Sequence, residues 1–294
     1  CAMLKMLPEY ESAVVVRTRD AKALEECDVV VDVGAVYDKD RHRYDHHQRE
    51  FADVMSELGH KTKLSSAGLV YRHFGYKVIA RLATAVLRDG GENAPDYDAV
   101  YRKIYKGFVE HVDGIDNGIE VFDSSARNYE VHTTLPDRIA SLNPRWNEPE
   151  GPDDINVRFQ SAVSLTGREF AGAVEAAVNS WWPARAIVAE ALDSAADLHP
   201  SRQILELKRP CPWQSHIFQL ESERAAASDE EVEGTAKYVI FPDSKGDGWR
   251  IQAVPFEEGS FRTRRPLPEA WRGLRGERLE ALLGLPGCIF AHAG

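Results

Sequence analysis

The stretch from Asp28 to His47, DVVVDVGAVYDKDRHRYDHH, brings carboxylates and imidazoles together within about one strand and one loop. Asp32 ends a run of valines that is typical of a buried parallel strand, and open α/β sheets bind ligands at the carboxyl ends of such strands. Further along come Asp45, His46 and His47 in a row. Carboxylates combined with neutral imidazoles suit Mn²⁺, Zn²⁺, Fe²⁺ or Co²⁺ better than Ca²⁺. The pattern therefore predicts a divalent-metal site.

Each of these residues also has a simpler explanation when it is considered alone. A strand-terminal aspartate often only caps a turn, and adjacent histidines often belong to ordinary surface hydrogen-bond networks. Folding alone does not explain their combination, because no loop needs several titratable groups at a buried strand end. If Asp32 and His46 share one cation, they must lie within about a dozen ångströms of each other. His42, four residues before His46, is a weaker candidate ligand.

Asp113 and Asp116 form a second pair of carboxylates, near the end of a predicted helix. Apolar residues recur at helical spacing over 100–112, and Gly118 is a natural helix stop. Residues three apart on a helix can point towards one spot, and carboxylates at a helix C-terminus are unfavourable unless a cation offsets the dipole. The sequence leaves two alternatives open: a metal ligand at one of these positions, or an exposed Asp-Asn-Gly turn.

The segment FRTRRPLPEAWRGLRG is rich in arginine, although the chain as a whole carries a formal net charge of −11. That charge argues against a broad basic surface that coats nucleic acid, but not against an enzyme that grips one strand end. Guanidinium groups match the geometry of phosphate and carboxylate, so these arginines are candidates for substrate binding. The alternative is a mixed-charge surface packed by proline and tryptophan. The candidates are Arg262, Arg264, Arg265, Arg272 and Arg275.

The elements that must position these residues are predicted from hydrophobic periodicity. Residues 13–17, 21–27 and 29–33 have the spacing of a strand, a helix and a strand. Residues 64–82 predict a helix with Ser65 or Ser66 as N-cap, and 157–195 predict helix interrupted at Pro183. The segments QILELK, HIFQL, KYVIF and WRIQAV read as strands, with an acidic hairpin tip at 228–234. A helix near 276–283 and a strand GCIFAH follow.

These elements predict an α/β protein with two domains. We expect a first domain over 1–152, a helical connector over 153–198 and a smaller α+β domain over 199–294. No run of about 20 apolar residues occurs, so we expect no membrane span. The four cysteines show no Cys-x-x-Cys pair, which favours a reducing compartment.

Long blocks of the sequence resemble the Asp-His-His (DHH) phosphoesterase superfamily and specifically the MYG1 exonuclease family. The resemblance covers essentially the whole chain. It implies a DHH-type parallel sheet flanked by helices, a helical connector and a smaller substrate-binding domain. It also implies a 3′→5′ exonuclease that hydrolyses phosphodiester bonds in single-stranded RNA or a short nucleotide. The blocks are DVVVDVGAVYDKDRHRYDHHQREF, TKLSSAGLVYRHFG, HVDGIDNGIE, SLNPRWN, WWPARAIV, GWRIQAVP, PLPEAWRGLRGERL and LPGCIFAHAG.

The resemblance also implies roles for the site residues. Asp32 would bridge two metal ions, His46 would bind one of them, and Asp113 or Asp116 would complete the ligand shell. His47 would contact the scissile phosphate, and Asp45 would orient a histidine from the second shell. The implied metal is Mn²⁺, with Mg²⁺ as the alternative. Family members are associated with mitochondria and the nucleus, so we expect an intracellular protein.

Two family features are not found in this sequence. The family carries a His-x-Asp-type metal motif just before the point at which this chain begins, so we expect the chain to bind one metal weakly or none. The family also continues with a glycine-rich segment after the position of His292, which puts the expected substrate contact of His292 in doubt. Two other functions fit the residues: a small-phosphoester hydrolase, such as a pyrophosphatase or nucleotide phosphodiesterase, and a catalytically inactive RNA-binding module.

Overall fold

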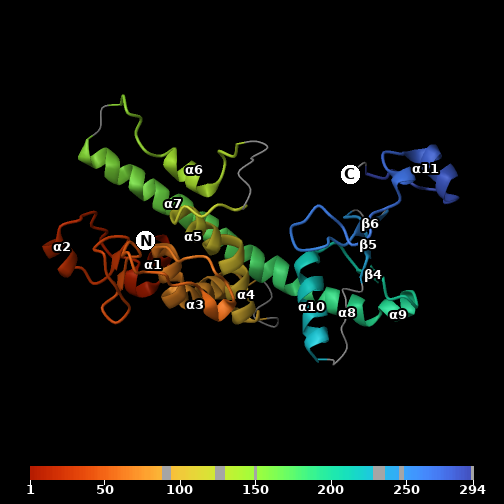
Figure 1. The fold of residues 1–294 in the computed structure, drawn as a ribbon, viewed down its shortest axis with the longest axis horizontal. Coiled ribbons are helices and arrows are strands. Elements are labelled where there is room, and N and C mark those ends of the chain that lie inside the picture. Colours follow the sequence, from red (N-terminus) through yellow and green to blue (C-terminus); the bar gives the residue numbers. More distant parts are fainter. Residues whose placement is uncertain (88–93, 123–129, 149–150, 228–235, 245–247, 293–294) are drawn as a thin grey trace. The chain divides into compact units, whose positions relative to one another are not determined.

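The computed structural model describes residues 1–87, 94–122, 130–148, 151–227, 236–244 and 248–292 (Figure 1). The chain divides into two compact units, Cys1–Trp182 and Pro183–Gly294. Both units are mixed α/β, and in the described residues each contains one three-stranded sheet. The division falls inside the segment predicted to connect two domains, and the roles assigned to those domains stay predictions.

The sheet of the first unit carries the predicted metal motif. Its strand order is β1-β3-β2, with β1 (Val30–Val31) parallel to β3 (Arg43–Tyr44) and β2 (Tyr37–Asp38) antiparallel to β3. The helix predicted before β1 is present as α2 (Ala21–Glu25). The strand predicted over 13–17 is wrong: no strand forms there, and Val14 is exposed. β-branched residues favour a strand only when neighbouring strands and a buried face give them something to pack against.

Helix α3 (Ser66–Val86) is the central helix of the first core, as predicted from its apolar spacing. Ser65 is its N-cap, and the Ser65 hydroxyl accepts hydrogen bonds from the backbone amides of Ala67 and Gly68. The helix packs against α1 (Ala2–Lys5), α4 (Tyr97–Ile104), α5 (Glu110–Asp116) and α7 (Pro152–Ala176). Although α3 is long, no helix of the described residues is long and apolar enough to cross a membrane.

Two helices contain π turns. A π turn over Tyr105–Val109 joins α4 to α5, and another over Ala177–Trp181 joins α7 to α8 (Trp182–Asp193). The second π turn lies just before Pro183, where the sequence predicts an interruption because proline lacks a backbone donor. The shorter helical elements are η1 (Pro8–Tyr10), η2 (Ser56–Leu58), α6 (Leu135–Ala140), α9 (Ala195–Leu198) and η5 (Glu269–Trp271).

The second unit contains three of its five predicted strands. β4 (Ile204–Glu206) pairs parallel with β5 (Tyr238–Pro242), which pairs antiparallel with β6 (Trp249–Ala253). The segment HIFQL lies inside helix α10 (Gln214–Ala227). Its apolar residues continue a helical repeat that begins at the buried Trp213 and includes Ile217 and Leu220. A segment of five residues is too short to show this helical spacing, and the prediction of a strand was wrong for that reason.

The predicted features near the C-terminus have mixed outcomes. The predicted helix is present as α11 (Gly276–Leu283). The strand GCIFAH is wrong: in the described residues of this segment, one isolated bridge pairs Phe290 with Arg275. The predicted acidic hairpin tip at 228–234 lies outside the described residues.

A buried ion pair ties α10 to the chain that follows β6. The guanidinium of Arg264 donates to both carboxylate oxygens of Glu221, at 3.0 and 2.7 Å, and the side chains are 10% and 7% exposed. Arg264 also donates to the carbonyl oxygen of Ala236 and lies over the ring of Phe218. Arg264 was predicted as a substrate-binding residue, but its donors are used inside the second unit.

We predict that Arg264→Ala lowers the free energy of unfolding by about 3 kcal/mol or more, because it leaves the Glu221 carboxylate buried without its partner. Urea unfolding of the whole chain, followed by circular dichroism, measures the change. The matched control is Arg224→Ala, which removes a surface ion pair with Asp193 and should cost about 1 kcal/mol or less. Equal losses for the two variants would contradict a structural role for the buried pair.

Candidate metal centre

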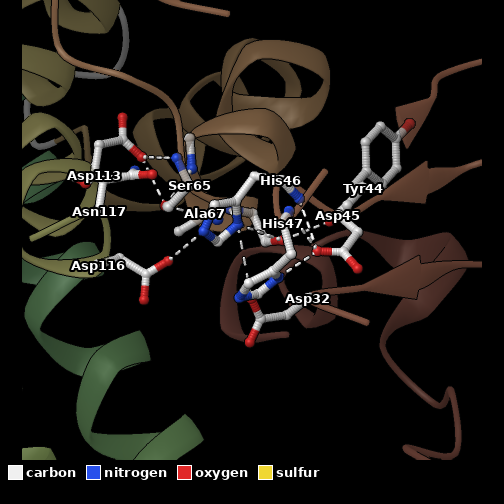
Figure 2. A network of polar contacts seen from close by, with 12 residues as sticks. Asp32, Tyr44, Asp45, His46, His47, Ser65, Ala67, Asp113, Asp116 and Asn117 are labelled. Carbon is white, nitrogen blue, oxygen red and sulfur yellow. Dashed lines mark hydrogen bonds and ion pairs between the residues drawn. The ribbon is translucent and has the colours of Figure 1, made fainter. Parts of the chain in front are cut away.

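The parallel pairing of β1 and β3 brings the predicted ligands together. Val31 pairs with Tyr44, so Asp32 and Asp45 leave neighbouring strands at the same edge of the sheet. The Oδ1 atom of Asp32 lies 3.9 Å from the Nδ1 atom of His46, well within the distance that a shared cation requires (Figure 2). Asp32 has a positive φ of 65°, a left-handed conformation that aspartate tolerates better than most residues.

His46 is buried and held on both sides of its ring. Its Nδ1 atom accepts a hydrogen bond from the backbone amide of Ser66 at 3.1 Å, and its Nε2 atom lies 3.2 Å from Oδ2 of Asp116. Burial lowers the pKa of His46, and this effect outweighs the negative charge of Asp116, which acts to raise it. The ring is therefore neutral near pH 7. With Nδ1 accepting, the neutral ring carries its proton on Nε2 and donates it to Asp116.

Ser66 also fixes the loop that carries His46. The Ser66 hydroxyl donates to the carbonyl oxygen of Tyr44, at the end of β3, and lies 3.5 Å from Nδ1 of His46. A proton on Nδ1 would leave Nε2 free to bind a cation, but it would remove the hydrogen bond that Nδ1 accepts from the Ser66 amide. The first residue of α3 thus favours the tautomer of His46 that carries its proton on Nε2.

Asp45 orients His47. The buried Asp45 carboxylate accepts hydrogen bonds from the amides of Ala35 and His46 and from Nδ1 of His47 at 2.6 Å. Burial alone would raise the pKa of Asp45, but the hydrogen bonds from His47 and Ala35 outweigh it and lower the pKa. The same contact raises the pKa of His47, whose ring is exposed. The arrangement favours the positively charged form of an exposed imidazole near Asp32.

The structure separates the two aspartates of α5. Asp116 lies at His46 with its carboxylate partly exposed, whereas Asp113 is fully buried one turn earlier (Figure 2). The Asp113 carboxylate accepts hydrogen bonds from the amide and hydroxyl of Ser65, at 2.9 and 2.7 Å, and from the hydroxyl of Tyr105 at 3.0 Å. A Cβ atom added to Gly68 would lie 2.3 Å from Asp113, so the backbone of α3 closes over this carboxylate.

The donor set at the sheet edge fits a divalent cation. Burial raises the pKa of Asp32, and the negative charge of Asp116 raises it further, so these carboxylates repel each other across His46. A cation would relieve this repulsion, and a neutral imidazole with carboxylates is the ligand set expected for Mn²⁺ or Zn²⁺. In the described part of the chain, ligand atoms of Asp32, Asp45, His46 and His47 all lie within 4.8 Å of one another.

The other predicted residues make different contacts. His42 hydrogen bonds to the hydroxyl of Tyr44 through Nδ1 and packs against Phe74, so it belongs to an aromatic cluster of the core. The remaining candidates are in the second unit. Arg262 and Arg275 lie over phenylalanine rings, Arg272 donates to the carbonyl oxygen of Leu267, and Arg265 and His292 are exposed.

Sequence analysis missed three residues that support the centre: Ser65, Ser66 and Tyr105. The helix pattern identifies both serines as N-cap candidates. Their contacts with the site could not be predicted from this pattern, because they arise only where α3 begins beside the Asp-His-His loop. Nothing in the sequence identifies Tyr105, since its contact with Asp113 depends on the π turn that begins at Tyr105.

The comparisons with known proteins agree over the whole chain. The MYG1 exonuclease family model, described as an uncharacterised protein family (UPF0160), matches residues 1–294. The chain is 47% identical to the MYG1 exonuclease of Bos taurus and 46% identical to that of Homo sapiens, covering all of this chain and 74% and 76% of those proteins. It is 40% identical to a MYG1 protein of Saccharomyces cerevisiae, covering 99% of this chain and 84% of that protein. No solved structure gives a significant match.

The burial of Asp113 predicts a pH-dependent contribution to stability. Burial raises the pKa of Asp113 from 3.8 to about 6, although the hydrogen bonds from Ser65 act to lower it. The folded protein therefore binds the proton of Asp113 more tightly than the unfolded chain does. The resulting stabilisation is fully present below about pH 4 and is lost as the pH rises through about 6, and it amounts to roughly 3 kcal/mol. Asp113→Asn should remove this dependence in urea unfolding with a metal chelator present.

The control for this experiment is Asp137→Asn. Asp137 is a partly exposed capping residue whose pKa is lowered by hydrogen bonds from Thr134, so its contribution is lost as the pH falls. Difference curves of opposite slope for the two variants are expected. A flat difference curve for Asp113→Asn between pH 4 and pH 7 would contradict the assignment.

Proposed function

The chain belongs to the MYG1 exonuclease family, and from that membership we propose that it is a metal-dependent nuclease that shortens single-stranded RNA from its 3′ end. The names of the relatives support nuclease-type hydrolysis. The observation that carries the metal-dependent part is the position of the neutral His46 ring between two carboxylates, with Asp32 near its Nδ1 atom and Asp116 near its Nε2 atom. We further propose that the parallel pair β1 and β3 belongs to a sheet of the DHH phosphoesterase type.

Three residues would hold the proposed cation, for which we favour Mn²⁺: Asp32, His46 and Asp116. Asp45 and Asp113 are less suited, because their carboxylate oxygens already accept hydrogen bonds from the protein. Between the two aspartates of α5, the contact with His46 favours Asp116 as the ligand. A bound divalent ion lowers the pKa of a water molecule and offsets charge on the phosphoryl oxygens.

His47 is the residue we propose for contact with the scissile phosphate. Its Nδ1–H donates to Asp45, which fixes the ring and favours the charged form. Its exposed ring can therefore present the other N–H to an anionic oxygen near the carboxylates. A positive charge held at this point would attract the phosphate and stabilise the negative charge that develops on it during hydrolysis.

We predict that the chain binds a single Mn²⁺ ion weakly and that Asp32→Asn or Asp116→Asn weakens this binding at least about tenfold. Calorimetric titration measures the affinity. The control is Asp40→Asn, an exposed aspartate before the Asp-His-His loop. Equal affinities in all four proteins would contradict the proposed site.

The nuclease proposal predicts stepwise shortening of a 5′-labelled single-stranded RNA in the presence of Mn²⁺. His47→Ala should slow this shortening about a hundredfold or more, and a blocked 3′ end should stop it. Gel electrophoresis of the labelled RNA follows the reaction. Release of phosphate from pyrophosphate without cleavage of RNA would indicate a small-phosphoester hydrolase instead. Binding of RNA without turnover would indicate an inactive binding module.

A further inference from the structure

A short hairpin in the second unit presents aromatic rings to solvent. We call residues 254–264 the aromatic hairpin. It directly follows β6, and its two arms are held by hydrogen bonds from the Phe256 amide to the Arg262 carbonyl at 2.7 Å and from the Arg264 amide to the Val254 carbonyl at 2.8 Å. The buried ion pair of Arg264 with Glu221 fixes its base. The hairpin is therefore anchored where it leaves the core.

The aromatic side chains near the tip of the aromatic hairpin are exposed to solvent. The Phe261 ring is fully exposed and Phe256 is mostly exposed, with the guanidinium of Arg262 4.4 Å above the centre of the Phe256 ring. On the preceding strand, Trp249 and Ile251 are also exposed and lie two residues apart, on one face of β6. Exposed apolar groups gathered in this way indicate a binding surface.

The charges around the aromatic hairpin favour an anionic ligand. Residues 249–275 contain six arginines and three glutamates, in a chain whose formal net charge is −11. Arg264 is the arginine that the buried ion pair neutralises, whereas Arg250, Arg262 and Arg265 are exposed. Flat rings next to exposed guanidinium groups match a ligand with flat bases and regularly spaced phosphates. An apolar peptide would leave the arginines without partners.

We propose that the aromatic hairpin binds single-stranded nucleic acid by stacking bases on Phe261 and Phe256 and by pairing a phosphate with Arg262. Single strands expose the faces of their bases, and proteins that hold them combine such rings with a positively charged surface. The inference rests on the proposed nuclease function, for which the hairpin would hold the substrate strand. It assigns the holding of the strand to residues outside the metal cluster.

The test measures binding alone, with the metal chelated so that no cleavage occurs. Fluorescence anisotropy of a labelled single-stranded RNA oligonucleotide is recorded for the whole chain at several salt concentrations. Phe261→Ala should weaken binding about 5- to 150-fold at every salt concentration, because it removes a stacking surface but no charge. Arg262→Gln should instead reduce the slope of the logarithm of affinity against the logarithm of salt concentration by about 0.7, as expected for one lost phosphate contact.

The control variant is Trp146→Ala, which removes a fully exposed ring in the first unit, next to an arginine that is paired with Glu148. Unchanged affinity in Phe261→Ala, or an equal loss in Trp146→Ala, would overturn the proposal. So would a salt slope that Arg262→Gln leaves unchanged. Thermal unfolding of each variant checks that the fold is retained, and the exposure of these side chains makes retention the expected result.

Three further outcomes separate this proposal from the alternatives. Loss of binding in Phe261→Ala together with absence of nuclease activity in the parent chain would uphold the binding surface and reject the proposed function. Nuclease activity on long RNA that Phe261→Ala does not alter would uphold the function and reject the surface. Sedimentation that shows self-association lost in Phe261→Ala, with RNA binding unchanged, would identify the hairpin as a contact between copies and overturn the proposal.

Discussion

The hydrogen bonds between the buried Asp113 carboxylate and Ser65 connect the two halves of the candidate metal centre. Ser65 begins α3, and the next residue, Ser66, holds His46 and the end of β3. Asp113 itself precedes Asp116 by one turn of α5. The buried carboxylate of Asp113 therefore fixes the position of the His46 imidazole relative to the Asp116 carboxylate. Burying it is costly, and its three protein donors offset part of that cost.

The aspartates of the centre fall into two groups with different surroundings. Asp45 and Asp113 are buried and accept several hydrogen bonds each, so they orient other groups. Asp32 and Asp116 are partly exposed and both approach His46, where the negative charge of Asp116 raises the pKa of Asp32. The protein thus supplies fixed supports for carboxylates that repel each other, which is the arrangement expected around a cation.

The sequence predicts the convergence of Asp32 and His46 well, because a strand end and the Asp-His-His run define one edge of a sheet. It predicts α3 for a similar reason, since the apolar repeat and the serine cap are local signals. It does not distinguish Asp113 from Asp116, because the choice depends on Ser65, Gly68 and Tyr105, which come from other parts of the chain. The same limit applies to Arg264, whose partner Glu221 lies on another element.

The π turn over Tyr105–Val109 has a consequence for how this centre tolerates changes in chain length. A π turn accommodates one residue more than an α-helical turn, and one residue of an α-helix corresponds to a rotation of about 100°. Deleting one residue there would therefore restore regular helical hydrogen bonding without changing the phase of α5, whereas regular hydrogen bonding with every residue kept would rotate the whole of α5 about its own axis. Both aspartates would then face away from their present partners, even though no residue of the centre had been replaced. The centre therefore depends on the phase of a helix as much as on the identity of its side chains.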